Sequence, residues 1–193
     1  MTTAQAAQEA RVVLRNVSWE TYERLLAERE DSTPRFTYYR GELELMSPLL
    51  PEHEEHADNL RVIVRVLAEE LGVGVRGFGS MTLRREDLQG GLEPDGCFYI
   101  ASEPRIRGKT RPDLRFDPPP DLTIEVDITN PSLDKLPVYV RLGVPELWRH
   151  DGRRLTILVL TGDRYLESVE SHALRGATAD DISDLLGESA QLD

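Results

Sequence analysis

The chain lacks the features of an exported or membrane-spanning protein. It has one cysteine, Cys97, so it can form no disulfide within the chain. No apolar run approaches the roughly 20 residues that span a bilayer. The N-terminus has no basic segment followed by an apolar core, as a secretory signal would have. These absences favour a cytoplasmic protein without a membrane partner.

Basic charge is also scarce. The 193 residues include 23 Lys and Arg against 35 Asp and Glu, which gives a net charge of −12. Taken alone, this balance argues against a nucleic-acid partner, because phosphate binding depends on Lys and Arg. Arginines are nevertheless concentrated at 84–85 and again within 105–115. Such runs suit either a phosphate-binding surface or a solvated loop, so charge leaves the partner open.

The remaining composition is that of a globular domain, with 39% hydrophobic and 30% charged residues. We expect a single domain over residues 1–193, in which residues 1–16 are a weakly structured N-terminal segment. Hydrophobic spacing predicts helices at 18–30, 51–71, 133–142 and 179–186, and strands at 35–46 (a hairpin), 73–83, 92–101, 122–128, 146–150, 154–161 and 164–169. Polar loops are expected at 84–91 and 102–120. This order predicts an α/β fold with a mixed sheet flanked by helices.

The strand at 122–128 has an unusual polar face. Aliphatic residues alternate along it with Thr123, Glu125 and Asp127, so that both acids point to the same side. Burying two unpaired carboxylates is costly, and a divalent metal is the simplest group to neutralise them. The strand therefore indicates a metal site.

A third acid, Asp95, lies in the strand predicted at 92–101, thirty residues before Glu125. If the two strands pair, both carboxylates can converge on one ion. Mg²⁺ prefers oxygen ligands and keeps several of its waters. Such a site activates water and stabilises charge on a phosphate that is under attack.

These residues lie in segments that resemble a known family. EPDGCFYI, followed by PPDLTIEVDIT, resembles the two core motifs of the PD-(D/E)XK nuclease superfamily, and more specifically of its Uma2 branch of restriction-endonuclease-like proteins. YYRGELELMSP, a following His53 and a long helix agree with that branch, as does YVRLGVPELWRHD downstream. The resemblance covers roughly residues 18–165. Several ordered motifs are far more specific than a lone Pro-Asp or Glu-x-Asp.

The resemblance implies a restriction-endonuclease-like core with a divalent-metal phosphodiesterase site. Asp95 and Glu125 would be metal ligands, and the backbone carbonyl of Val126 would be a further one. The cofactor would be Mg²⁺ or Mn²⁺. His53 would line the mouth of the site, and Glu42, next to the hairpin turn, would supply an extra acid.

One departure from the family pattern concerns its lysine. That lysine normally follows the second acid by two residues, where this chain has Asp127. Two alternatives are open. Lys135 reaches back from the following helix, or Asp127 acts as a third carboxylate ligand and the metal provides all of the positive charge. We favour Asp127 near the metal, with Lys135 assisting.

The sequence thus predicts a metal-dependent endonuclease that hydrolyses DNA phosphodiester bonds. A catalytically silent relative, which uses the fold to bind nucleic acid or protein, is the main alternative, and an enzyme acting on a smaller phosphate ester is a third. The fold also suggests a homodimer, with the apolar segment Leu155–Leu160 as an exposed edge for pairing.

Overall fold

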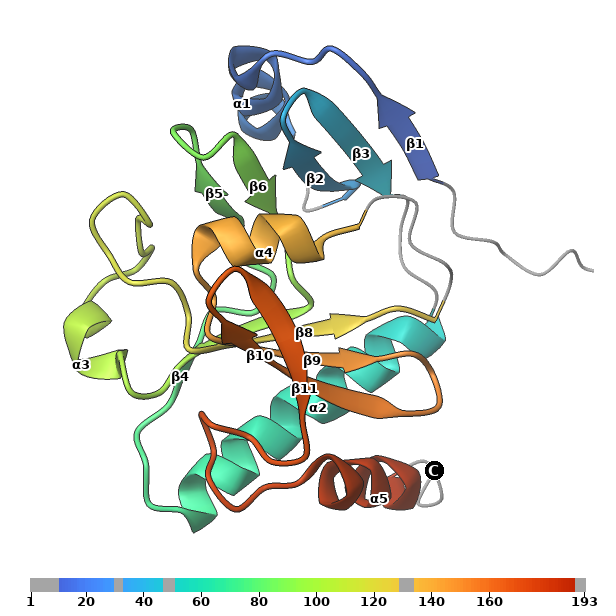
Figure 1. The fold of residues 1–193 in the computed structure, drawn as a ribbon, viewed down its shortest axis with the longest axis vertical. Helices are drawn as coiled ribbons and strands as arrows, with labels where there is room; N and C mark the ends of the chain where they lie inside the picture. The colour runs from blue at the N-terminus through green and yellow to red at the C-terminus, as the bar shows by residue number, and fades with distance from the viewer. Residues whose placement is uncertain (1–10, 30–32, 47–50, 129–133, 190–193) are drawn as a thin grey trace, which may run out of the picture.

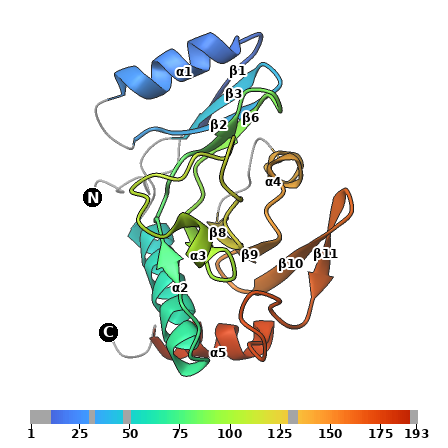
Figure 2. The same cartoon turned by 90° about the vertical axis from the view of Figure 1, so that its left-hand side faces the viewer.

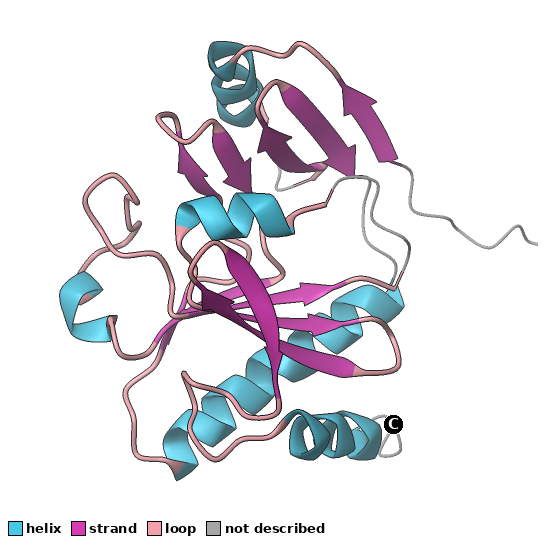
Figure 3. Cartoon of the chain, viewed as in Figure 1, coloured by secondary structure: helices cyan, strands magenta, loops and turns pink. Residues whose placement is uncertain are grey.

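A computed structural model describes residues 11–29, 33–46, 51–128 and 134–189. Within these ranges the strands form two sheets, which we call sheet A and sheet B, with helices packed around them (Figures 1 and 3). The expected α/β fold with a mixed, helix-flanked sheet is confirmed in sheet B. Sheet A contains the hairpin predicted at 35–46, but the sequence did not predict that this hairpin belongs to a separate sheet. None of the helices in the described ranges is long and apolar enough to cross a membrane.

Sheet B contains the predicted metal-site strand near its centre. Its strand order is β11-β10-β9-β8-β7-β4. Strands β8 and β9 are parallel, and the other neighbours are antiparallel. The strands are β4 (Arg76–Gly77), β7 (Gly96–Tyr99), β8 (Leu122–Val126), β9 (Glu146–His150), β10 (Leu155–Thr161) and β11 (Arg164–Ser168). The predicted meander of β9, β10 and β11 and the pairing of β7 with β8 are confirmed.

Helices cover both faces of sheet B. Helix α2 (Pro51–Glu70) and helix α5 (Ala179–Ser189) pack on one face, where Leu60 and Val64 of α2 meet Ile124 of β8 in the main apolar core. Helix α4 (Leu136–Leu142) lies on the other face, between sheets A and B (Figure 2). Because side chains alternate along β8, the face opposite α2 turns Thr123 and Glu125 toward α4.

Sheet A is antiparallel, with the strand order β1-β3-β2-β6-β5. Its strands are β1 (Arg11–Leu14), β2 (Arg35–Tyr39), β3 (Glu42–Met46), β5 (Leu83–Arg85) and β6 (Gly90–Leu92). Helix α1 (Trp19–Glu28) packs on one face, where Tyr22 stacks on Tyr38 with ring centroids 4.8 Å apart. Ser18 accepts a hydrogen bond from Thr21 N at 3.2 Å and caps this helix, as expected of an N-cap serine.

Several predicted boundaries are wrong. Part of the N-terminal segment forms β1, and the strand expected at 73–83 is reduced to the two residues of β4. The expected loop 84–91 instead lies within the β5–β6 hairpin, and the strand at 92–101 is divided by Pro94 and Asp95 into β6 and β7. The loop 102–120 includes the short helix α3 (Glu103–Ile106). The start of the helix predicted at 133–142 lies outside the described residues, and α4 has Pro137 in its first turn, where a proline is tolerated.

The proposed dimer edge is also wrong. Strand β10, which contains Leu155–Leu160, pairs with β9 on one side and with β11 on the other. Its backbone groups are therefore used within the sheet, and β10 cannot add a strand from a second copy. The homodimer itself stays a prediction. Sedimentation of the protein at micromolar concentration tests it by measuring the oligomeric state.

A buried carboxylate fixes the chain that follows β11 to sheet B. Glu146, 1% exposed, accepts hydrogen bonds from Trp148 Nε1 at 2.7 Å and from Ser171 Oγ at 2.6 Å. The backbone amides of His172 and Ala173 donate to the same carboxylate, at 2.7 and 3.0 Å. A buried acid with this many donors is well satisfied, and it attaches the segment that leads to α5.

Candidate functional site

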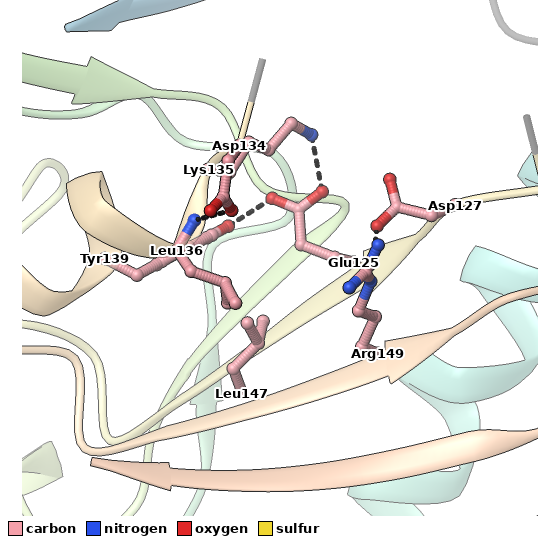
Figure 4. A pocket seen from close by; sticks show the side chains of 8 residues that line it. All are labelled: Glu125, Asp127, Asp134, Lys135, Leu136, Tyr139, Leu147 and Arg149. Atoms are coloured by element: carbon pink, nitrogen blue, oxygen red, sulfur yellow. Dashed lines mark hydrogen bonds and ion pairs between the residues drawn. The ribbon is translucent and has the colours of Figure 1, made fainter. Parts of the chain in front are cut away.

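Glu125 lies in the middle of β8 and is 2% exposed. Two side chains from the beginning of α4 reach it. Lys135 Nζ lies 2.6 Å from Glu125 Oε2, and the Tyr139 hydroxyl donates a hydrogen bond to Glu125 Oε1 (Figure 4). A buried acid is thus held between a cation and a hydroxyl group that one helix supplies.

The local sequence explains why α4 presents both groups. Lys135 is the N-cap residue and Tyr139 follows it by four positions, so both lie on the same side of the helix. Gly143 ends the helix in the left-handed conformation, with φ of 72°, and its amide returns to Tyr139 O at 3.0 Å. Helix α4 is therefore joined to β8 through Lys135 and Tyr139, and it ends at Gly143.

Burial determines the acidity of this group. It raises the pKa of Glu125 to about 7, opposed by Lys135 and reinforced by the charges of Asp95 and Asp127. Burial alone would lower the pKa of Lys135, but the carboxylates around it, Glu125 first, raise the pKa above its usual value. Lys135 is therefore a persistent cation beside an acid that other acids make harder to ionise.

Asp95 lies in the bend just before β7 and is 1% exposed. Its Oδ2 accepts a hydrogen bond from Val126 N at 2.7 Å, and its Oδ1 is paired with the Arg35 guanidinium from sheet A. His53 Nε2 lies 3.5 Å from Oδ2, while His53 Nδ1 is buried and has no hydrogen-bond partner among the described residues. Because β7 pairs with β8, Asp95 lies next to Glu125, as the spacing of the two acids predicted.

Asp127 follows the end of β8, and its carboxylate pairs with Arg149 Nε at 2.8 Å. The parallel register of β8 and β9 places Arg149 opposite Glu125. A pocket of about 30 Å³ opens here, lined by Glu125, Asp127, Lys135, Tyr139 and Arg149 together with neighbouring side chains (Figure 4). This volume exceeds the 10–15 Å³ that one water requires, so the pocket has room for water beside the acids.

Glu42 has a different environment from the other predicted acids. It lies in β3 of sheet A, its side chain is 43% exposed, and it pairs with Arg15 at 3.2 Å. Within the described ranges it forms no hydrogen bond or ion pair with Asp95 or Glu125. Glu42 is therefore not part of the site. The other six predicted site residues lie together, and they are His53, Asp95, Glu125, Val126, Asp127 and Lys135.

Comparisons with known proteins agree with this architecture. The profile of the Uma2 family, described as "Putative restriction endonuclease", matches residues 19–186. The chain belongs to the Uma2 family. A solved structure described as a "putative nuclease belonging to DUF820" from Anabaena variabilis has a TM-score of 0.57 at 14% identity, covering 85% of this chain and 97% of that one. No curated protein matches. The shared fold confirms the expected restriction-endonuclease-like core.

Three residues that contact the acids of this Uma2 chain were missed by sequence reasoning: Arg35, Tyr139 and Arg149. Tyr139 could have been found, because it follows Lys135 by one helical turn. Arg149 depends on the register of a parallel strand pair, and Arg35 comes from a second sheet. Neither relation is encoded in local spacing.

Donor chemistry in the Uma2 site suits a divalent cation. Asp95 and Glu125 supply oxygen ligands, and Mg²⁺ is often held by one or two carboxylates and completed by waters. The charge of Asp95 helps to raise the pKa of Glu125, so a cation between them would relieve their repulsion. In the described part of the chain, no three His, Cys, Asp or Glu side chains are grouped to hold a metal. The residues thus fit a water-rich, two-carboxylate site better than a closed one.

Proposed function

We propose that this Uma2 protein is a Mg²⁺- or Mn²⁺-dependent endonuclease that hydrolyses DNA phosphodiester bonds. The observation that carries the proposal is the convergence of two distant acids. Strand β7 pairs with β8, and the amide of Val126, the residue after Glu125, donates to the Asp95 carboxylate. Two carboxylates at one point of a sheet, in a chain of this family, support metal-assisted phosphodiester hydrolysis.

Asp95, Glu125 and the carbonyl of Val126 would hold the ion, with Asp127 as an additional carboxylate. A bound ion supplies an activated water and neutralises charge that develops on the phosphate. Lys135 and Tyr139 orient the Glu125 carboxylate through its two oxygens. Arg35 and His53 flank the Asp95 carboxylate.

Lys135 provides the positive charge that Asp127 cannot. Lys135 lines the same pocket as Glu125 and Asp127, and the pairing of β7 with β8 places Asp95 next to Glu125. An ammonium has three donors, so Lys135 can hold Glu125 and also donate to a phosphate oxygen. Its pKa is raised by the acids around it, which keeps this donor charged. This supports the first of the two alternatives for the displaced lysine.

The test is a calorimetric Mn²⁺ titration of the wild type and of Asp95→Ala and Glu125→Ala. We expect binding in the wild type that is weakened at least about tenfold in both variants, because each loses one anionic ligand. Glu42→Ala is the matched control: it also removes one carboxylate, but from sheet A, and should bind Mn²⁺ as the wild type does. Nicking of a supercoiled plasmid with Mg²⁺ should then be lost in the two site variants.

A catalytically silent Uma2 relative is the second candidate, and one observation favours it. Each of the three acids already has a protein cation, because Asp95 pairs with Arg35, Glu125 with Lys135 and Asp127 with Arg149. A binding module needs no metal to neutralise acids that are already paired. Absence of Mn²⁺ binding in the wild type would overturn the nuclease proposal and leave this alternative.

A further inference from the structure

A second, much larger cavity lies away from the acids. It is a groove of about 650 Å³ between α1, the β5 region and the loop after α3. In the view of Figure 1, these three segments lie above or to the left of α4. Leu114 is buried under the groove and packs in the same apolar cluster as Tyr139 of α4. The groove and the pocket around Glu125 share no lining residue, so they are separate sites.

The groove is the exception to the acidic character of the chain. Five arginines and four acids line it, whereas the whole chain has a net charge of −12. Arg84 pairs with Glu23 at 2.9 Å and Arg115 with Asp113 at 2.6 Å. Arg85 pairs with Asp87, which is not among the lining residues.

Two of the arginines remain available. Arg24 of α1 and Arg111 of the loop are exposed, and within the described ranges no acid forms an ion pair with either of them. They line the groove from two different segments. Two guanidinium groups without an ion-pair partner in one groove are suited to two phosphates of one strand.

An exposed aromatic ring lies next to the groove-lining Arg115. Phe116, next to the groove-lining Arg115, is 79% exposed, and the Arg115 guanidinium lies 5.5 Å from its ring centroid. Trp19 forms part of the groove lining. Exposed rings combined with a cationic groove are what single-stranded nucleic acids use, because unstacked bases pack on the rings while the backbone follows the charges.

We propose that this groove binds a segment of single-stranded DNA, with Arg24 and Arg111 on phosphates and Phe116 under a base. The choice of DNA rests on the proposed nuclease function. A strand bound here would anchor the substrate at a distance from the acid pocket, so the net acidity of the chain would not prevent substrate binding.

The experiment is fluorescence anisotropy with a labelled 12-nucleotide oligo(dT), in EDTA so that neither cleavage nor the metal contributes. Arg24→Ala/Arg111→Ala should weaken binding at least about tenfold and reduce the slope of log affinity against log salt by about 1.4, because about 0.7 is lost per phosphate contact to a single strand. Phe116→Ala should weaken binding about tenfold with little change in that slope.

The matched control is Arg164→Ala/Arg175→Ala, which removes the same charge from two exposed arginines outside the groove. It should bind as the wild type does. Glu20→Gln/Glu86→Gln, which neutralises two acids of the groove, should strengthen binding about threefold. Equal weakening by both arginine pairs, equally tight duplex binding that is insensitive to Phe116→Ala, or tighter binding of oligo(U) would overturn the proposal.

Failure of this proposal is distinguishable from failure of the nuclease function. The groove variants should raise KM for cleavage of an oligonucleotide and leave kcat unchanged, whereas Glu125→Gln should abolish kcat and leave anisotropy unchanged. A wild type that cleaves but does not bind through the groove refutes the groove alone. A wild type that binds through the groove but neither cleaves nor binds Mn²⁺ refutes the nuclease alone.

Discussion

The pocket around Glu125 and the groove lined by five arginines differ in how deeply their charged side chains are buried. In the pocket, Glu125 and Lys135 are buried, and their side chains are 3% and 13% exposed. In the groove, the paired side chains of Glu23 and Arg84 are 35% and 33% exposed. Burial strengthens electrostatic interactions and raises the penalty for an unmatched charge, whereas water weakens both effects. The same ion-pair chemistry therefore determines structure in the pocket and leaves the groove free to exchange partners.

Among these variants, Lys135→Met should have the largest effect on the free energy of unfolding. It leaves the Glu125 carboxylate buried without its cation, and removing one partner of a buried pair typically costs about 3–5 kcal/mol. Urea unfolding at pH 8 measures the loss. Glu125→Gln/Lys135→Met should recover much of it, because no charge is then left unpaired. A double variant as unstable as the single one would contradict this account.

The next largest difference between the pocket and the groove should be in how their carboxyl groups depend on pH. The pKa of Glu125 is raised from 4.5 to about 7 by burial, so its contribution to stability is fully present below pH 4.5 and is lost as the pH rises through about 7. As the pH rises from 4.5 to about 7 in EDTA, the free energy of unfolding of the wild type should fall relative to that of Glu125→Gln. In the groove, hydrogen bonds from Arg115 lower the pKa of Asp113 to about 2. Carboxyl NMR titration should show the two acids shifted in opposite directions.

Tyr139→Phe should have a smaller effect of the same kind. It removes the hydrogen bond to Glu125 Oε1, and hydrogen bonds to charged groups contribute about 1.5–3 kcal/mol. The control is Tyr165→Phe, which removes a hydroxyl that donates to the neutral carbonyl of Val144 at 2.6 Å and should cost about 1 kcal/mol. Equal losses in thermal unfolding would show that the Glu125 bond has no special role.

Arg84→Ala should have the smallest effect. It breaks a partly exposed ion pair with Glu23, and such pairs contribute about 0–1 kcal/mol. Urea unfolding should show a change below about 1 kcal/mol that diminishes further in high salt. A loss as large as that of Lys135→Met would mean that the groove is a structural element and not an open surface.

Local alternation and spacing were sufficient to predict the acids. The alternation along β8 placed Glu125 opposite the apolar face, whereas Lys135, ten residues later, was suggested by the family resemblance and its missing lysine. The sequence could not predict the second sheet. Gly90 and Gly91 look like a loop, yet they form β6, where a side chain at Gly91 would collide with the Tyr22 hydroxyl. A glycine that is required by a neighbour distant in sequence cannot be distinguished from one that ends a strand.

Arg35 and the groove could not be predicted from the sequence for a related reason. Arg35 meets Asp95 across sixty residues, between two sheets whose packing no local pattern specifies. The groove is assembled from α1, β5 and a loop, and its arginines are far apart in the sequence. The arginine runs at 84–85 and 105–115 were visible, but their separation into paired and available side chains depends on tertiary contacts.

The hydrogen bonds to the buried Glu146 carboxylate have a consequence for amide hydrogen exchange. The amides of His172 and Ala173 lie in a connecting segment, where exchange with solvent is normally fast, yet both donate to a buried carboxylate. They can exchange only when that segment detaches from β9. We therefore expect their protection factors to match those of the central strands, and Glu146→Gln to lower them selectively. The resistance of this loop to proteases would follow from the same single side chain.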